Sequence, residues 1–262
     1  MGPDAAAAVD AIAGLRWWHA LEVAPGVVTP GPWDLRHAAA RMPWPGRGEL
    51  GGLRCLDVGT MDGFWAFELE RRGAAEVVAV DLVDPARHDA PVGEAPVGGA
   101  PAGGGHGGQE RGRTFRVAAG LLGSRARYVD ASVYGLDPAV LGTFDVVVAG
   151  YLLQALRDPL RGLEALRRVC RGHLLLLDTV SRPLSLLPAP VARLDARRDG
   201  REWFVFNRRG LAKALTLAGF RVEAASGILR DRYRPVPGAP RPDAATLLRH
   251  ALPLRGRSLA LR

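Results

Sequence analysis

The 262 residues, 48% hydrophobic and 24% charged, suffice for one large α/β domain with a buried core. The net charge of +8 rests on arginine, since Lys213 is the single lysine; a GC-rich genome explains this bias better than a nucleic-acid partner, because no dense basic run with interleaved aromatics occurs. With only two cysteines, neither a disulfide scaffold nor a zinc site is expected. The sequence has no signal-peptide pattern and no run of 18 apolar residues, so we expect a cytoplasmic protein that does not span a membrane.

Residues 1–50 are predicted to form an N-terminal helical arm. The alanine-rich stretch 4–14 favours a helix, whereas the Pro- and Gly-rich stretch 22–34 favours a loop. The aromatic side chains of the arm need cover, which folding over the active site would supply. Trp33 is therefore a candidate for substrate binding and His19 for catalysis, although packing of the arm on the core explains them equally well.

Residues 53–81 have the pattern of a strand, a glycine turn, a helix and a second strand. The apolar run 53–58 predicts a buried parallel strand with Asp57 at its carboxyl end. Gly59 and Gly63 then suit a turn that brings backbone close to a ligand. The second strand ends at Asp81, which is 22 residues after Gly59 and well placed to bind both hydroxyls of a ribose.

Two classes of cofactor use this geometry. The dinucleotide fingerprint G-x-G-x-x-G fails, because Met61 and Phe64 occupy the positions of its second and third glycines. The S-adenosylmethionine (SAM) loop, roughly acid-x-G-x-G-x-G, is matched at the acid and at two glycines, with Met61 in place of the middle one. The spacing therefore favours SAM, while a dinucleotide site and a purely structural turn remain alternatives.

Residues 83–113 are predicted to be a flexible insertion, since nine glycines lie between Gly93 and Gly112. A helix is expected from Phe115, and then a short strand that ends at Asp130. Asp130 can accept a hydrogen bond from the adenine amino group, and the N–H of the next residue, Ala131, can donate one to a ring nitrogen. The alternative is that Asp130 only caps a turn.

The apolar stretch 145–149 predicts a central strand, which brings Gly150, Tyr151 and Gln154 to the carboxyl edge of the sheet, where ligands of open α/β sheets bind. Asp158 is expected to cap a helix. Residues 203–206 are expected to form a short lid. Asn207 is either a helix cap or a substrate contact. Residues 220–229 and 258–261 are expected to form an antiparallel pair of strands.

Three segments carry a resemblance to a known family: residues 57–73, residues 144–159, and residues 203–207 with 218–220. Together they resemble class I SAM-dependent methyltransferases, in particular the group that includes the tRNA wobble-uridine (carboxy)methyltransferases, over about residues 15 to 225. The resemblance implies a Rossmann-like α/β fold, with a seven-stranded, mostly parallel sheet and helices on both faces. It also implies an N-terminal arm, residues 1–50, followed by a SAM-binding domain, residues 51–262.

Residues for the site follow from the motif and the resemblance together. The cofactor is expected to contact Asp57, Gly59, Thr60, Asp62, Gly63, Asp81, Leu82, Asp130, Ala131, Ala149 and Gly150. The candidates for the substrate wall are Trp33, Tyr151, Gln154, Trp203 and Asn207, and those for catalysis are His19, Tyr151 and Gln154. Relatives that carry a histidine before the Leu-Arg-Asp-Pro run have their counterpart here in Ala155, so their mechanism does not transfer directly.

The predicted function is transfer of a methyl group from SAM to a small-molecule acceptor such as a secondary metabolite. A tRNA-modifying methyl- or carboxymethyltransferase and a non-catalytic binding protein of the same fold are the alternatives. Relatives that use carboxy-SAM hold its carboxylate with a lysine upstream of the motif, and Lys213 is far downstream, so ordinary SAM is favoured.

Overall fold

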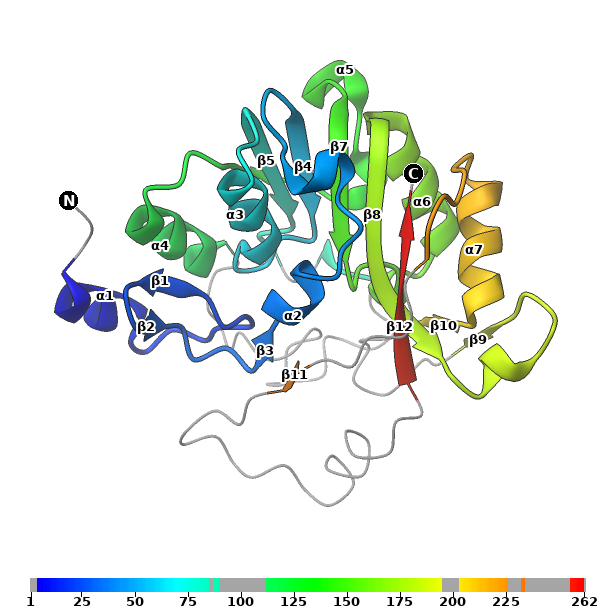
Figure 1. Cartoon of the computed structure of the whole chain (residues 1–262), viewed down its shortest axis with the longest axis horizontal. Coiled ribbons are helices and arrows are strands. Elements are labelled where there is room, and N and C mark those ends of the chain that lie inside the picture. Colours follow the sequence, from blue (N-terminus) through cyan, green and yellow to red (C-terminus); the bar gives the residue numbers. More distant parts are fainter. Residues whose placement is uncertain are drawn as a thin grey trace.

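The structure is a computed structural model that describes residues 4–84, 87–89, 112–194, 203–225, 232–233 and 255–261. Helices alternate with strands through most of these residues (Figure 1). The helices are α1 (Ala5–Ile12), α2 (Arg36–Ala39), α3 (Phe64–Arg71), α4 (Arg113–Leu122), α5 (Pro138–Leu141), α6 (Pro159–Val169) and α7 (Arg208–Leu217). The strands are β1 (Glu22–Ala24), β2 (Val27–Val28), β3 (Trp33–Asp34), β4 (Arg54–Val58), β5 (Glu76–Asp81), β6 (Arg127–Asp130), β7 (Phe144–Gly150), β8 (Cys170–Ser181), β9 (Ala192–Leu194), β10 (Phe204–Phe206), β11 (Arg232–Tyr233) and β12 (Arg255–Leu261).

The central sheet runs in the order β6-β5-β4-β7-β8-β10-β9, and β12 pairs with β8 as a further strand. The strands from β6 to β10 are parallel, whereas β9 and β12 are antiparallel to their partners. The chain passes from β4 outward to β5 and β6, and then returns to place β7 on the other side of β4. This reversal creates a topological switch point between β4 and β7.

Two hydrophobic clusters cover the two faces of the sheet, because successive side chains of a strand point to opposite faces. In β4, Cys55 packs with α3 and α4 on one face, while Leu56 packs with α6 and α7 on the other. The same alternation holds in β7 and β8, whose apolar residues are almost all fully buried. The sheet is therefore a central layer between two helical layers, which confirms the predicted Rossmann-like fold.

The arm contributes strands as well as helices. It contains α1, the β1–β2 hairpin, β3 and α2, and β3 pairs antiparallel with β11 from the far end of the sequence. Arm residues such as Trp17 and Val23 belong to the same hydrophobic cluster as Trp65 of α3 and Phe115 of α4. The arm is thus packed on one helical face of the domain as part of its core.

The structure bears on three expectations about secondary structure. The segment 203–206 contains β10, an element of the sheet rather than a lid. The strand expected over 220–229 is absent from residues 221–224, and residues 226–229 lie outside the described part of the chain. The final strand is present as β12, but it pairs with β8 over seven residues. The expected pairing of this strand with the segment 220–229 stays a prediction.

The predicted flexible insertion is described only at its two ends. Residues 85–86 and 90–111 lie outside the described part, so its flexibility stays a prediction. Asp89 is fixed, since its carboxylate accepts hydrogen bonds from the Tyr134 hydroxyl at 2.6 Å and the Arg157 backbone N–H at 2.7 Å. The start of the insertion therefore lies against the carboxyl edge of the sheet.

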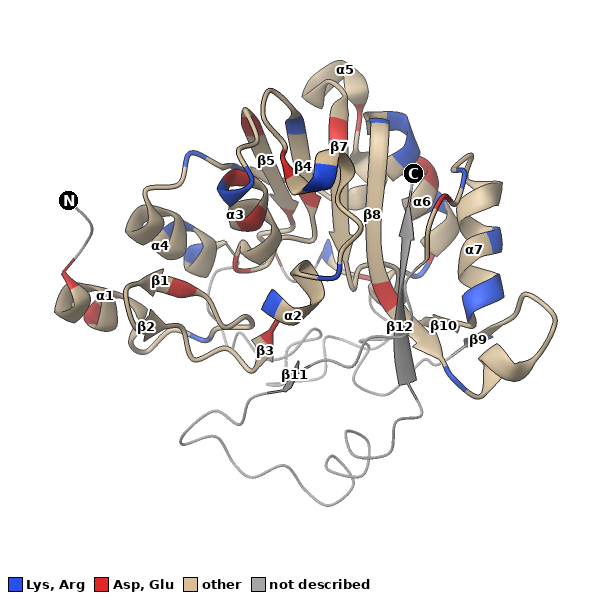
Figure 2. Ribbon diagram, viewed as in Figure 1, with Lys and Arg blue, Asp and Glu red and all other residues tan. Residues whose placement is uncertain are grey.

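Charged residues of both signs lie next to one another on α3 and on α6 (Figure 2). No helix among the described residues is long and apolar enough to cross a membrane. The same part of the chain contains no group of three or more His, Cys, Asp or Glu residues arranged to hold a metal ion.

Candidate functional site

The candidate site lies where the loops after β4 and β7 meet. A Cβ added to Gly59, just after β4, would lie 3.4 Å from the Leu152 side chain in the loop after β7. Both loops start from the carboxyl ends of adjacent parallel strands, on either side of the switch point. Open α/β sheets bind their ligands in this crevice, so the structure brings the two predicted halves of the site together.

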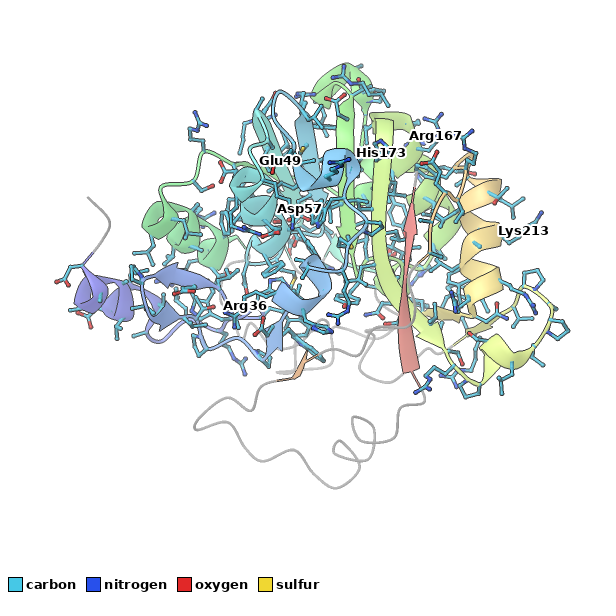
Figure 3. The ribbon with its side chains drawn as sticks, in the orientation of Figure 1. Arg36, Glu49, Asp57, Arg167, His173 and Lys213 are labelled. Atoms are coloured by element: carbon cyan, nitrogen blue, oxygen red, sulfur yellow. The ribbon has the colours of Figure 1, made fainter. Side chains whose placement is uncertain are left out.

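Asp57 is the buried acid at the end of β4 (Figure 3). Its Oδ2 accepts hydrogen bonds from the Thr60 hydroxyl at 2.6 Å and from the Ala66 N–H at 3.0 Å. Its Oδ1 is fully buried and has no hydrogen-bond partner in the protein. Burial raises the pKa of this carboxyl from 3.8 to about 7, against the lowering effect of the Thr60 and Ala66 hydrogen bonds.

The turn between β4 and α3 uses left-handed backbone at three positions. Gly59 has φ 80°, Gly63 has φ 95°, and Met61 between them has φ 51°. A Cβ at Gly63 would also lie 2.5 Å from the Phe67 ring. Met61 thus keeps the conformation of the glycine that it replaces, at a cost of about 1–2 kcal/mol for an L-residue.

Asp81, at the end of β5, helps to fix this turn. One carboxylate oxygen accepts the Met61 N–H at 2.8 Å, and the other accepts the Leu82 N–H at 2.7 Å. The carboxylate therefore faces the turn and not the outer surface of the sheet, and 8% of the residue remains exposed. This is the position from which an acid reaches a ribose in doubly wound folds.

Asp62 has a different role from the expected contact with the cofactor. Its side chain is fully buried, and it accepts hydrogen bonds from the backbone N–H groups of Trp18 at 2.5 Å and His19 at 2.7 Å. It also accepts the Thr114 hydroxyl at 2.6 Å. The carboxylate is directed at the arm and at α4, because those segments supply its donors. No sequence pattern pointed to Thr114, which is 52 residues away.

The expected adenine edge at the end of β6 is arranged differently from the prediction. The Ala131 N–H donates to the Asp81 carbonyl at 3.1 Å, so it is not directed at a ligand. Asp130 accepts the Val83 N–H at 3.0 Å and pairs with Arg87 at 2.9 Å. Arg87 was not among the candidates, since a single arginine in a glycine-rich segment carries no sequence signal of its own.

Tyr151 follows β7 in a left-handed conformation, with φ 58°. Its N–H donates to the Leu177 carbonyl at 2.6 Å, and its ring packs against the cluster that includes the arm. A Cβ at the preceding Gly150 would lie 2.4 Å from the Trp65 indole nitrogen. Ala149 is fully buried in the other cluster, so it has only backbone to offer a ligand. Strained backbone of this kind is concentrated at functional sites.

The remaining residues of the substrate wall are mostly engaged with each other. The Gln154 side-chain oxygen accepts the Thr179 hydroxyl, and the Gln154 carbonyl accepts the Trp203 N–H at 2.7 Å. The Trp203 indole donates to the Asp89 carbonyl at 3.4 Å, and Arg157 lies 4.9 Å from the centre of its ring. Gln154 and Trp203 therefore lie side by side, together with the start of the insertion.

Asn207 is the N-cap of α7, which is the first of the two roles that the sequence suggested for it. It is fully buried, and its side-chain oxygen accepts the N–H groups of Gly210 and Val191. Its amide nitrogen donates to the carbonyls of Leu184 and Ala189. Because both ends of the amide are bonded within the protein, the substrate-contact interpretation loses its physical basis.

His19 is held through its backbone, while its ring nitrogen Nδ1 is buried without a hydrogen-bond partner. The His19 carbonyl accepts the Thr29 hydroxyl at 2.6 Å, and the ring lies 6.0 Å from that of Phe64. Burial lowers the pKa of the imidazole to about 3, so it is neutral at physiological pH. Trp33 is half-buried, forms a bridge with His19 and lies 6.4 Å from the Trp18 ring.

The donor set suits SAM. The unpartnered Asp57 Oδ1 provides a buried acceptor for a cationic group, and the left-handed glycines allow close approach of a ligand to the backbone. The number of residues between the turn and Asp81 is the one expected for an acid that binds a ribose. The turn itself lacks the glycine pattern that binds the pyrophosphate of a dinucleotide.

Comparison with known proteins agrees with this geometry. The chain matches the family "Methyltransferase domain" over residues 33–225, which is most of its length, and it belongs to that family. It is a SAM-dependent methyltransferase of the Rossmann-like class, as the motif indicated. No curated protein sequence matches the chain significantly.

Several solved structures share the fold. The N-terminal domain of EvdMO1 with S-adenosylhomocysteine (SAH) bound is 17% identical, with a TM-score of 0.58, over 99% of this chain and 97% of that one. A SAM-dependent methyltransferase from Mesorhizobium loti is 18% identical, with a TM-score of 0.51, over 87% and 97%. The 1,6-didemethyltoxoflavin-N1-methyltransferase of Burkholderia thailandensis is 21% identical, with a TM-score of 0.50, over 87% and 76%. At these identities the likeness shows the fold alone.

Proposed function

We propose that this methyltransferase transfers the methyl group of SAM to a small organic molecule, held between the arm and the loop after β7. The observation that carries the proposal is the attachment of the arm to the SAM loop through Asp62. An arm fixed at this position brings His19, a candidate for catalysis, next to the loop. The mixed charges on α3 and α6 (Figure 2) also differ from the dense basic surface that tRNA binding requires.

The structural neighbours agree with a small acceptor. The Burkholderia enzyme was solved with 1,6-didemethyltoxoflavin and SAH bound, and EvdMO1 in the presence of SAH and D-fucose. These are properties of those proteins, and they support the proposal only as examples of the fold. The tRNA-modifying and non-catalytic alternatives have no comparable observation in their favour.

We assign the cofactor to the turn between β4 and α3. Asp57 would face the cationic amino group, Gly59 and Gly63 would allow close contact, and Asp81 would bind the ribose. SAM supplies an electrophilic methyl group, so the remaining task of the protein is to align the acceptor and exclude water. Tyr151, at the strained end of β7, is the foremost candidate for that alignment.

His19 fits the role of a hydrogen-bond acceptor better than that of a strong base. A group with a pKa of about 3 takes a proton poorly from a hydroxyl at neutral pH. A neutral imidazole with an unpartnered Nδ1 is still able to accept a hydrogen bond from the acceptor molecule and to orient it. This narrows the role of His19, which the sequence indicated only as a candidate for catalysis.

Calorimetry and methyl transfer test the proposal in sequence. We expect the protein to bind SAM and not NAD, and to transfer label from methyl-labelled SAM to the low-molecular-mass fraction of a cell extract but not to bulk tRNA. Binding of NAD in place of SAM would overturn the cofactor assignment. Label in tRNA would overturn the acceptor class, and SAM binding without transfer to either fraction would favour the non-catalytic alternative.

A further inference from the structure

One buried carboxylate joins three segments that are distant in the sequence. Asp62, in the turn before α3, accepts hydrogen bonds from two consecutive N–H groups of the arm, those of Trp18 and His19. Its other oxygen accepts the hydroxyl of Thr114, in the first turn of α4. The exposed fraction of Asp62 is zero, so a change to asparagine would replace one buried acceptor oxygen with an NH2 group that faces another donor.

The residue before Asp62 belongs to the cofactor turn. Met61 has left-handed backbone, and its N–H is held by the Asp81 carboxylate at 2.8 Å. The amide that Asp81 binds and the carboxylate that binds the arm therefore belong to consecutive residues. Because this backbone is strained, a shift at one of the two anchors must change the geometry of the other.

The arm is rigid at the point where Asp62 holds it. The His19 N–H is bound by Asp62, and its carbonyl by the Thr29 hydroxyl at 2.6 Å. Gly31 packs so closely on the same backbone that an added Cβ would lie 2.1 Å from the His19 carbonyl oxygen. The position of the His19 ring is consequently set by contacts of its backbone, with Asp62 as the link to the turn.

We propose that Asp62 is a positioning residue that couples docking of residues 17–19 to binding of the cofactor in the turn 59–63. A ligand that engages Asp81 and the turn stabilises the backbone at Met61, and through Asp62 it stabilises the docked arm. In return, the docked arm fixes the turn before the cofactor arrives. The inference rests on the proposed cofactor site, but it concerns the link between the site and the arm.

Limited proteolysis with SAH as the ligand tests this coupling. Arg16 is exposed and immediately precedes the docked residues, so trypsin cleavage after Arg16 reports release of the arm. In the wild type we expect saturating SAH to slow this cleavage about tenfold or more. In Asp62→Asn, which keeps the volume and removes the charge, we expect SAH affinity to fall about tenfold and the protection to disappear even at saturation.

Two further variants control the experiment. Asp4→Asn removes a carboxylate at the exposed N-cap of α1 in the same arm, and it should behave as the wild type. Thr114→Val keeps both arm hydrogen bonds and removes only the third donor, so it should lower SAH protection by a smaller factor. If Asp62→Asn does not fold, the wild type decides, and binding of SAH without slower cleavage after Arg16 would overturn the inference.

The outcomes separate this inference from the proposed function. Failure of the wild type to bind SAH would contradict the cofactor site itself. Binding of SAH without protection at Arg16 would contradict the coupling and leave the cofactor site intact. Equal affinity and equal protection in Asp62→Asn and the wild type would show that Asp62 only stabilises the fold.

Discussion

The two loops that meet at the switch point are fixed in different ways. The turn 59–63 after β4 is held by three carboxylates, those of Asp57, Asp62 and Asp81. The loop 150–155 after β7 is held from β8 by one buried carboxylate, that of Asp178, which accepts the Leu153 N–H at 2.8 Å. Tyr151 N–H also donates to a β8 carbonyl, and the Gln154 side chain accepts the Thr179 hydroxyl. Yet each loop contains one non-glycine residue with left-handed backbone, Met61 and Tyr151.

The proposed function assigns the first loop to the cofactor and the second to the acceptor molecule. A cofactor is the same in every catalytic cycle and across a class of enzymes, so the first loop is built from buried charges with fixed backbone partners. An acceptor molecule differs between enzymes, and the second loop depends on side chains of nearby segments. The first loop is therefore readable from its own sequence, whereas the second requires the neighbours to be known.

The largest expected effect concerns the charge on Asp57 in the ligand-free protein. Burial raises its folded-state pKa from 3.8 to about 7, so the folded state binds the proton more tightly than the unfolded state does. The contribution of Asp57 to the free energy of unfolding is fully present below pH 3.8. It falls by about 4 kcal/mol as the pH rises to about 7. Asp57→Asn should lack this loss, so its stability relative to wild type should rise across that range in urea denaturation. A constant difference at all pH values would contradict the prediction.

The second prediction concerns binding of SAM. Asp81→Ala removes the acceptor of the Met61 and Leu82 N–H groups together with the expected ribose contact. We expect SAM affinity by calorimetry to fall about 100-fold, equal to about 3 kcal/mol. Glu76→Ala at the opposite end of the same strand, where Glu76 pairs with Arg54, is the matched control and should leave affinity unchanged. An unchanged affinity in Asp81→Ala would remove this strand end from the site.

A third prediction separates structure from recognition near the second loop. Asn207→Ala removes the cap of α7 and four buried hydrogen bonds, so we expect unfolding to become about 2 kcal/mol easier. SAM affinity at a temperature where the variant is folded should be unchanged. Thr216→Ala, an exposed position in the same helix, should have little effect on stability. Substrate specificity that changes without a loss of stability would restore the substrate interpretation.

The smallest expected effect is the strain at the two left-handed residues. Met61→Gly should be more stable than Met61→Ala by about 1 kcal/mol, and Tyr151→Gly more stable than Tyr151→Ala by a similar amount. At Lys213, an exposed position on α7 (Figure 3), the order should reverse, because glycine disfavours a helix. Urea denaturation of the six variants measures these differences. An advantage of alanine at Met61 would show that the left-handed backbone carries no strain there.

Several features of the fold were predictable because their causes are local. The apolar run before Asp57 and the glycines after it specify a strand followed by a turn, and both are found. Asp158 caps α6 with proline as the next residue, and Gly73 follows α3 with φ 87°, both as expected from cap preferences. In each case the residues that determine the structure lie within a few positions of one another.

The long antiparallel pairing of β12 with β8 was not predictable, for the opposite reason. Leu261 pairs with Leu175, and no local pattern records which of several apolar strands will accept a late strand. Ala131 was likewise expected to present its N–H to a ligand, but β5 uses that group to extend the sheet. Which backbone N–H groups of a strand stay available for a ligand is known only once the neighbouring strand is known.

The sequence by itself therefore determined the class of the fold, the cofactor turn and the acids at the ends of β4 and β5, because strand, glycine turn and acid are set by neighbouring residues. Only the tertiary structure decided that Asp62 binds the arm and that Asn207 is fully engaged as a cap. The donors to Asp62 are 43 to 52 residues away, and a carboxylate acquires its role from whichever donors folding brings to it.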